Sequence, residues 1–304
     1  MSPDDLKANL FIAGMAKCGT HALHFMLNQH PAIAMSSVKE PCHFVNGEDI
    51  RSSWPNRAQY QDYKTYRSLF TTMPETLYLG EASMLYTKLP RLKGVPQRIY
   101  EYNPDARFIF SIRSPLERVV SGYFNNYSSK LEREDGLERI LTNRRYVDES
   151  DYAMQIRPYL ELFPSSQIKI IVAERMRQFP GQVVQDIVSW LGLPPLENLD
   201  LGTEPDRNVT GDRVGQPKPW VKQLRLRDLA AWKYASRNAP APIKNLAIKL
   251  LFRNFVDKAA VPVDILEQEL HPELIRIVED IEALLGEPIP EWQNDLAKWR
   301  ALAT

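Results

Sequence analysis

Residues 10–23 read LFIAGMAKCGTHAL: an apolar stretch leads into a turn bounded by Gly14 and Gly19, and a helical pattern follows. Glycine adopts backbone conformations that are closed to other residues, so successive N–H groups can converge on one anion at the positive end of a helix dipole. The stretch therefore predicts a phosphate cradle between a strand and a helix. In the triphosphatase loop G-x-x-x-x-G-K-[ST] the lysine follows the second glycine. Here Lys17 lies two residues before Gly19, which argues against ATP as the ligand.

Composition and length narrow the class of protein. The 304 residues are enough for a full core, and we expect a single domain over 1–304. The 38 Lys and Arg balance the 38 Asp and Glu, so the net charge favours no nucleic acid or other polyanion as a partner. Two cysteines imply no disulfide framework, and no apolar stretch is long enough for a signal peptide or a membrane span. We expect a cytoplasmic protein, and the sequence leaves its oligomeric state open.

Short apolar runs alternate with helical patterns, which predicts an α/β fold whose parallel sheet is linked by crossover helices. Five strands are expected, over 10–13, 32–35, 78–81, 107–112 and 168–172. Helices are expected over 20–29, 115–127, 180–191, 220–258 and 272–285, and 202–219 is expected to be a loop. Ser114 and Glu117 have the spacing of a capping box before the second of these helices. The fold expected is a P-loop-like central sheet of about five strands flanked by helices, with a helical C-terminal segment. Residues 220–260 are interpreted as a helical insertion or lid-like segment.

Four further segments match one known family together with the Lys17-x-Gly19-Thr20 loop. They are Ser111–Ser121 (SIRSPLERVVS), Lys39–Phe44 (KEPCHF), Gly80–Tyr86 (GEASMLY) and Trp190–Leu193 (WLGL). With the loop, these segments resemble the sulfotransferases that use 3′-phosphoadenosine 5′-phosphosulfate (PAPS), and the carbohydrate (heparan-type) branch in particular. A soluble bacterial-type member is the expectation. The resemblance extends over residues 8–215 and 262–299.

The resemblance implies PAPS as co-substrate, 3′-phosphoadenosine 5′-phosphate (PAP) as product, and transfer without a metal. Lys17 is expected to stabilise the leaving phosphate oxygen. The donor's 5′ side is expected to contact Lys17, Cys18, Gly19, Thr20, His21 and Ala22. Its 3′-phosphate is expected to contact Arg113 and Ser121, with Arg213 closing over it from a loop that also carries Arg207 and Lys218.

Two residues compete for the role of general base. Glu40 matches the catalytic glutamate of the carbohydrate branch residue for residue, and a carboxylate within reach of the acceptor hydroxyl can take its proton. His43 is the alternative, because imidazole is the commonest base and the family's small-molecule branch uses histidine. Position in the motif favours Glu40.

The acceptor is expected to bind over residues 50–70, where aromatic rings and cations occur together, and Trp54 and Arg57 are candidate contacts with Tyr86. The heparan-type enzymes have a lysine at the position of Ala82, which weakens the case for a sulfated-glycan acceptor. A small-molecule, carrier-linked or short saccharide acceptor is therefore expected. Whether a hydroxyl or an amine receives the sulfuryl group is left open.

Three other interpretations remain. Cys18, His21, His24, Cys42 and His43 invite a zinc site, but no C-x-x-C or H-E-x-x-H spacing occurs. A P-loop nucleotide kinase or NTPase is disfavoured by the position of Lys17 and by the lack of an obvious strand-end aspartate for Mg²⁺. A non-catalytic nucleotide-binding protein of the same fold is disfavoured by the presence of both Glu40 and Lys17.

Overall fold

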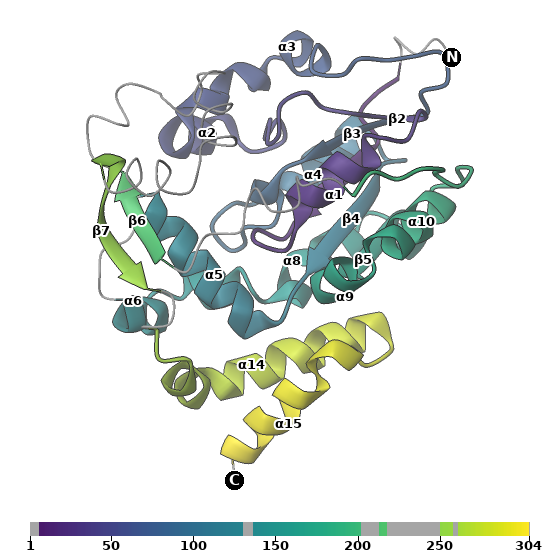
Figure 1. The fold of residues 1–304 in the computed structure, drawn as a ribbon. Coiled ribbons are helices and arrows are strands. Elements are labelled where there is room, and N and C mark those ends of the chain that lie inside the picture. Colours follow the sequence, from purple (N-terminus) through teal and green to yellow (C-terminus); the bar gives the residue numbers. More distant parts are fainter. Residues whose placement is uncertain (1–5, 130–135, 202–212, 218–249, 258–260, 304) are drawn as a thin grey trace. The chain divides into compact units, whose positions relative to one another are not determined.

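The computed structural model describes residues 6–129, 136–201, 213–217, 250–257 and 261–303. Its central feature is a parallel sheet in the order β2-β3-β1-β4-β5 (Figure 1). The strands are β1 (Leu10–Gly14), β2 (Ile33–Met35), β3 (Tyr78–Ala82), β4 (Arg107–Ile112) and β5 (Ile168–Val172). The five predicted strands and the α/β class are confirmed. The strands could be predicted because strands that are buried on both faces have near-continuous apolar sequences.

The chain divides into two compact units. One comprises Met1–Arg118, Val147–Asn208 and His271–Thr304 and contains the parallel sheet. The other comprises Val119–Tyr146 and Val209–Leu270. The expectation of one domain over 1–304 stays a prediction.

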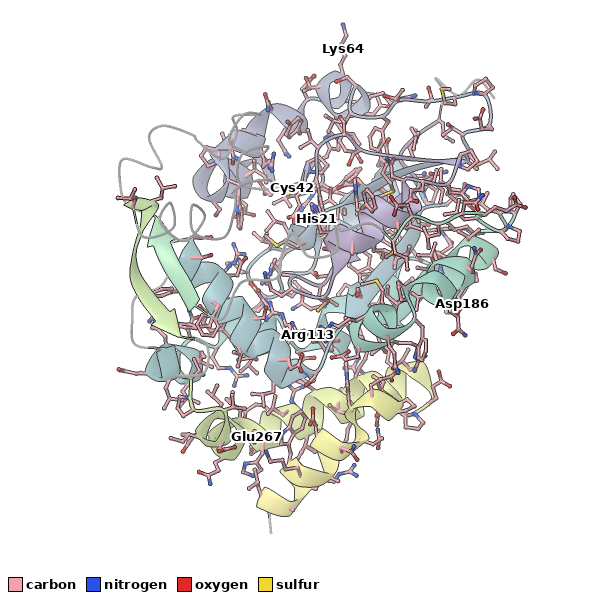
Figure 2. All side chains as sticks on the ribbon, viewed as in Figure 1. His21, Cys42, Lys64, Arg113, Asp186 and Glu267 are labelled. Carbon is pink, nitrogen blue, oxygen red and sulfur yellow. The ribbon has the colours of Figure 1, made fainter. Side chains whose placement is uncertain are left out.

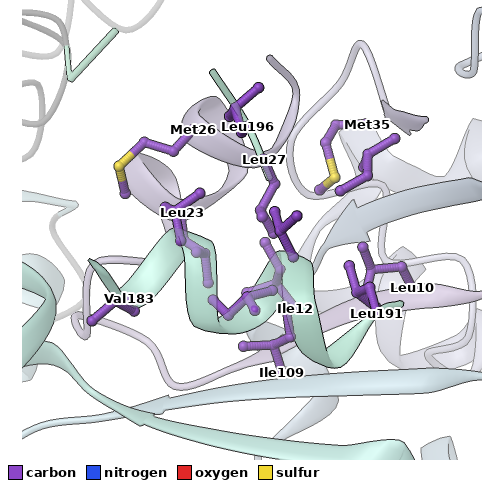
Figure 3. Close-up of a cluster of buried hydrophobic side chains, with 14 of the residues drawn as sticks. Leu10, Ile12, Leu23, Met26, Leu27, Met35, Ile109, Val183, Leu191 and Leu196 are labelled. Atoms are coloured by element: carbon purple, nitrogen blue, oxygen red, sulfur yellow. The ribbon is translucent and has the colours of Figure 1, made fainter. Parts of the chain in front are cut away.

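One face of the sheet carries an aliphatic core (Figure 3). Leu10 and Ile12 of β1 pack in this cluster with side chains of α1 (Thr20–Leu27) and α10 (Pro180–Trp190). Helix α10 begins at Pro180, as helices favour at their first position, and Gly192 just beyond it adopts a φ of 75°. Both helices confirm the pattern expected from the sequence.

The opposite face of the sheet is aromatic, because alternate residues of a strand point to opposite sides. Phe11 of β1 stacks on Phe108 of β4 with ring centroids 5.5 Å apart. Tyr159 of α8 (Tyr152–Leu160) contacts Phe108 and Phe110, each at 5.0 Å. The sheet is therefore covered on both faces, and its strand ends are the places left for polar groups.

The other described helices are between 3 and 23 residues long. Helix α5 (Pro115–Ser128) follows β4, and the C-terminal segment contains α14 (Val263–Leu285), the 3₁₀ helix η8 (Pro290–Trp292) and α15 (Gln293–Leu302). The remaining ones are α2 (Gly47–Ser53), η2 (Pro55–Gln61), α3 (Tyr63–Arg67), η3 (Met84–Tyr86), α4 (Val95–Tyr102), α6 (Gly136–Thr142), α7 (Arg145–Asp148), η4 (Ser165–Gln167) and α9 (Ala173–Gln178). Trp292 and Trp299 are fully buried, so the helical C-terminal segment predicted from the sequence is part of the folded structure.

Three local predictions are wrong. Arg213–Pro217 forms strand β6 where a loop is predicted, and it pairs in antiparallel fashion with β7 (Phe252–Asp257), which lies inside the predicted helix 220–258. The part of that helix over 218–249 lies outside the described residues. The capping box is not formed, because the Ser114 N–H donates to Glu174 at 2.9 Å and Glu117 pairs with Arg113.

Candidate active site

The strand order places one edge of the sheet at a topological switch point. From β1 the chain crosses β3 to reach β2, and from β3 it passes to β4 on the other side of β1. In open α/β sheets, ligands bind outside the carboxyl ends of the strands at such a point. The predicted phosphate loop follows β1, the Lys39–Phe44 segment follows β2, and Arg113 follows β4. Figure 2 labels Arg113, Cys42 of the Lys39–Phe44 segment, and His21 in the first turn of α1, directly after the loop.

The loop between β1 and α1 is held tightly. Gly14 and Gly19 have φ values of 143° and 81°, which other residues rarely adopt. A Cβ on Gly14 would clash with Thr87, and one on Gly19 would lie 2.5 Å from Met176 Cε. The Met15 N–H donates to Ser111 O of β4 at 2.8 Å, and Ser111 Oγ donates to Cys18 O at 2.5 Å. Close packing and hydrogen bonds thus fix the loop against β4.

Lys17 and Cys18 differ within this loop. Lys17 is half-buried and has a φ of 73°, a left-handed conformation that non-glycine residues adopt mostly where the surroundings impose it. The Cys18 side chain is fully buried, and burial raises the pKa of its thiol to about 12. The Cys18 N–H donates to Met15 O at 3.2 Å. The structure therefore gives Cys18 a place in shaping the loop, whereas Lys17 lies at its surface.

Helix α1 begins directly after Gly19. Its first hydrogen bond runs from the Leu23 N–H to Gly19 O at 3.2 Å. The N–H groups of a helix's first turn have no carbonyl within the helix to bond, and the helix dipole makes this end positive. Thr20 and Ala22 present such groups at the switch point, next to Lys17. This end of α1 is suited to a phosphate or sulfate group.

Lys39 joins this helix end to Glu40. Its Nζ lies 3.3 Å from Thr20 Oγ1 and 3.2 Å from Glu40 Oε1. Glu40 has a φ of 52°, and its Oε2 accepts a hydrogen bond from the Met84 N–H at 3.4 Å. Arg57 Nη2 donates to the Lys39 carbonyl at 3.2 Å. The structure therefore brings the predicted base, the predicted donor loop and one predicted acceptor residue together around Lys39.

The buried carboxylate of Glu81 accepts hydrogen bonds from three hydroxyl groups. Ser83 Oγ donates to Oε2 at 2.5 Å, while the hydroxyls of Tyr86 and Tyr66 donate to Oε1 at 2.5 and 3.2 Å. Ser83 Oγ in turn accepts from the Cys42 N–H at 3.0 Å, and the Tyr86 hydroxyl accepts from the Phe44 N–H at 3.3 Å. The network fixes the segment that carries Glu40. The network also engages the hydroxyl of Tyr86. Tyr86, a predicted acceptor contact, is therefore buried.

The Glu81 carboxyl gives the fold a specific pH dependence. Burial raises its pKa from the ordinary 4.5 to about 7, although the three hydroxyl donors oppose the shift. Between these values the unfolded chain releases a proton that the folded protein keeps, so stability falls as the pH rises from 4.5 to 7. We expect urea unfolding to show a loss on the order of 3 kcal/mol between pH 4.5 and 8 in the wild type that is absent from Glu81→Gln. Parallel pH profiles for the two proteins would contradict this account.

The His43 ring is packed among aromatic side chains. Its ring stacks on Tyr66 at 4.1 Å between centroids and meets Phe44 edge-on at 4.8 Å. Nδ1 lies 2.5 Å from Tyr60 O, and burial lowers the pKa of the imidazole. One ring nitrogen thus faces a backbone carbonyl, and the choice between Glu40 and His43 as the base stays a prediction.

Trp54 and Arg57, which follow the Lys39–Phe44 segment in sequence, are half-buried. The Arg57 guanidinium is 6.0 Å from the centre of the Tyr60 ring, and the Arg91 guanidinium is 5.2 Å from that of Trp54. Cations and aromatic faces are thus paired as expected, in the segment that follows Glu40.

The residues predicted for the 3′-phosphate lie on separate elements. Arg113 directly follows β4, and its Nε donates to Glu117 Oε2 at 2.6 Å. The Tyr152 hydroxyl donates to the Arg113 carbonyl at 2.5 Å and fixes the backbone there. Ser121 is half-buried in α5, and Arg213 is the first residue of β6. Arg207 and Lys218 lie outside the described residues.

The described residues form neither a metal-binding cluster nor a membrane-crossing helix. No group of three or more His, Cys, Asp or Glu side chains there is arranged to hold a metal ion. None of the described helices has the length and apolar character needed to cross a membrane. Metal-independent transfer stays a prediction.

A phosphate cradle and a carboxylate at the switch point of a parallel sheet define a nucleotide-binding α/β protein suited to group transfer. The family model of the sulfotransferase domain matches residues 7–203. The chain therefore belongs to the sulfotransferase family, as its motifs predicted.

Curated relatives of this chain include heparan sulfate enzymes. A bifunctional heparan sulfate N-deacetylase/N-sulfotransferase of Drosophila melanogaster is 26% identical over 96% of this chain and 27% of its own length. The human heparan sulfate glucosamine 3-O-sulfotransferase 6 is 28% identical over 72% of this chain and 66% of its own length. The chain thus spans between 27% and 66% of these relatives. The resemblance to the carbohydrate branch is confirmed.

A solved structure shows the same fold. The crystal structure of a sulfotransferase from Alicyclobacillus acidocaldarius superimposes with a TM-score of 0.64 and covers 95% of this chain and 99% of its own chain, at 23% identity. The α/β architecture derived above is therefore that of a sulfotransferase.

Proposed function

We propose that this chain transfers the sulfuryl group of PAPS to a hydroxyl or amine of an acceptor. The observation that carries the proposal is the contact of Lys39 with both Thr20, at the predicted phosphate site, and Glu40, the predicted base. Sulfuryl transfer needs these two groups on opposite sides of one sulfur atom. Membership of the sulfotransferase family supports this reaction over phosphoryl transfer.

In the proposed reaction, the 5′-phosphosulfate lies on the N–H groups at the start of α1. Glu40 takes the proton of the acceptor group as its oxygen or nitrogen bonds to sulfur. The bond between sulfur and the bridging oxygen breaks, and that oxygen leaves on PAP with the electron pair. Lys17 donates to this oxygen and stabilises the negative charge that develops on it. Gly19, Thr20, His21 and Ala22 hold the phosphate, and Cys18 shapes their loop.

Arg113, Ser121 and Arg213 are the proposed contacts of the 3′-phosphate. A guanidinium at a strand end is a fixed fork that suits a phosphate. In this structure the fork is occupied by Glu117, whose side chain is 49% exposed. A bound 3′-phosphate would compete with that carboxylate for Arg113.

The acceptor is proposed to bind beside Trp54 and Arg57. The named relatives act on heparan sulfate, which favours a saccharide. The neutral chain and Ala82 favour a short saccharide or a small or carrier-linked molecule over a long sulfated glycan. A screen of acceptors with ³⁵S-labelled PAPS tests this choice, because a polyanionic acceptor should show a KM that rises steeply with salt. We also propose that the protein is cytoplasmic.

Nucleotide preference tests the donor site without an acceptor. PAP at about 100 times its Kd should stabilise the fold by about 2.7 kcal/mol, while ATP with Mg²⁺ or AMP, both lacking the 3′-phosphate, should stabilise it far less. Arg113→Ala should weaken PAP binding by about 2–3 kcal/mol. Thermal unfolding and titration calorimetry measure both effects.

The matched control is Arg157→Ala, which removes an exposed arginine of α8 and should leave PAP binding unchanged. Equal stabilisation by PAP and ATP with Mg²⁺ would refute the PAPS site. An unchanged Kd in Arg113→Ala would remove that residue from it.

A further inference from the structure

Lys39 is the residue at which three segments with different proposed tasks meet. Its ammonium bonds Thr20 of α1 and Glu40, and its carbonyl accepts from Arg57. The Lys39 side chain is only 14% exposed, and that of Glu40 is 21% exposed. An ion pair this enclosed is less screened than a surface pair, so its charges act on their neighbours.

The ammonium has one donor left over. A lysine carries three N–H groups, and two of those on Lys39 have acceptors in Thr20 Oγ1 and Glu40 Oε1. Within the part of the chain that the structure describes, no group accepts a hydrogen bond from the third N–H. Because Nζ lies at the first turn of α1, this donor is within reach of an anion placed there.

The charges at this point explain why a cation is needed. A phosphosulfate on α1 and the Glu40 carboxylate are both negative, and bringing them close together without a cation is unfavourable. His24, which lies further along α1, supplies no such charge near neutral pH, since burial and the neighbouring Lys39 lower its pKa to about 4. Lys39 is the cation that contacts both sides.

We propose that Lys39 is a catalytic residue that binds the phosphosulfate group of the donor through its third N–H while holding Glu40 in position for the acceptor. This role rests on the proposed function. It differs from that of Lys17, which serves the leaving oxygen, because Lys39 offsets the repulsion between donor and base. Lys39 thereby links donor binding to the orientation of the base.

The test uses Lys39→Met, which keeps the length and removes the charge, and Lys39→Arg, which keeps the charge. Lys169→Met, on the edge strand β5, is the control for loss of a half-buried lysine. Titration calorimetry should show PAP affinity reduced about tenfold to a hundredfold in Lys39→Met. We expect Lys39→Arg to recover most of this loss and Lys169→Met to bind PAP like the wild type.

A double-mutant cycle isolates the repulsion. In a Glu40→Gln background the base is neutral, so Lys39→Met should lower PAP affinity by a factor at least about threefold smaller than in the wild-type background. Urea unfolding of each variant shows whether the fold is retained.

The outcomes separate the two proposals. If the wild type fails to bind PAP, the proposed function is refuted. If the wild type binds PAP and Lys39→Met binds it equally well, the role of Lys39 is refuted and the proposed function stands. Equal losses in the two Glu40 backgrounds would also overturn the offset of repulsion.

Discussion

Glu40→Gln should lower kcat for sulfuryl transfer by about 10²–10⁴ and leave PAP affinity within about threefold of the wild type. The amide keeps the shape of the side chain and can still accept from Lys39, but it cannot take the acceptor's proton. The expected loss is therefore in turnover. Steady-state kinetics with saturating PAPS, together with calorimetry of PAP, measures the two quantities.

His43→Asn is the comparison for this variant. Its imidazole is stacked on Tyr66 and bonded to Tyr60, so the substitution should affect stability more than kcat. An inactive but folded His43→Asn beside an active Glu40→Gln would show that the histidine is the base.

Lys17→Ala should lower kcat by at least about 10². Its ammonium is proposed to bond the bridging oxygen, where negative charge grows only as the bond to sulfur breaks. An interaction that strengthens in the transition state appears in kcat, whereas one that only anchors the donor appears in KM. A change confined to the KM for PAPS would mean that Lys17 holds the donor and takes no part in bond cleavage.

The parallel sheet could be predicted because its signals are local. Each strand is a short apolar run, and α10 ends at Trp190, two residues before Gly192, where the helix pattern stops. The antiparallel pair of β6 and β7 could not be predicted in the same way. Strand β6 contains Gly215 and Pro217, which are typical of loops, and its pairing with β7 depends on a segment distant in sequence.

The residues of the candidate site could be predicted where they lie in a recognisable sequence motif. Lys17 and Glu40 were found from their segments, and both have left-handed backbones at the switch point. Tyr86 was predicted to face the acceptor because a motif does not report burial, yet its hydroxyl is taken by Glu81. Ser114 and Glu117 have the spacing of a capping box. In the structure, however, the Ser114 N–H donates to Glu174 of α9, and the Glu117 carboxylate accepts from Arg113.

The part played by Lys39 depends on the tertiary structure. The sequence shows that Lys39 is next to Glu40, and such a neighbour is usually a solvent-exposed partner. Its bond to Thr20 exists because β2 and β1 end at the same edge of the sheet. The fold, and not the spacing, brings the ammonium to the start of α1.

A crystal structure of the chain with PAP bound is the most direct test of the proposed site. We expect the 5′-phosphate within hydrogen-bond distance of the N–H groups of Thr20 and Ala22, with Lys17 and Lys39 directed toward it and Arg113 at the 3′-phosphate. A 5′-phosphate bound away from the start of α1, with both lysines turned from the nucleotide, would contradict this expectation.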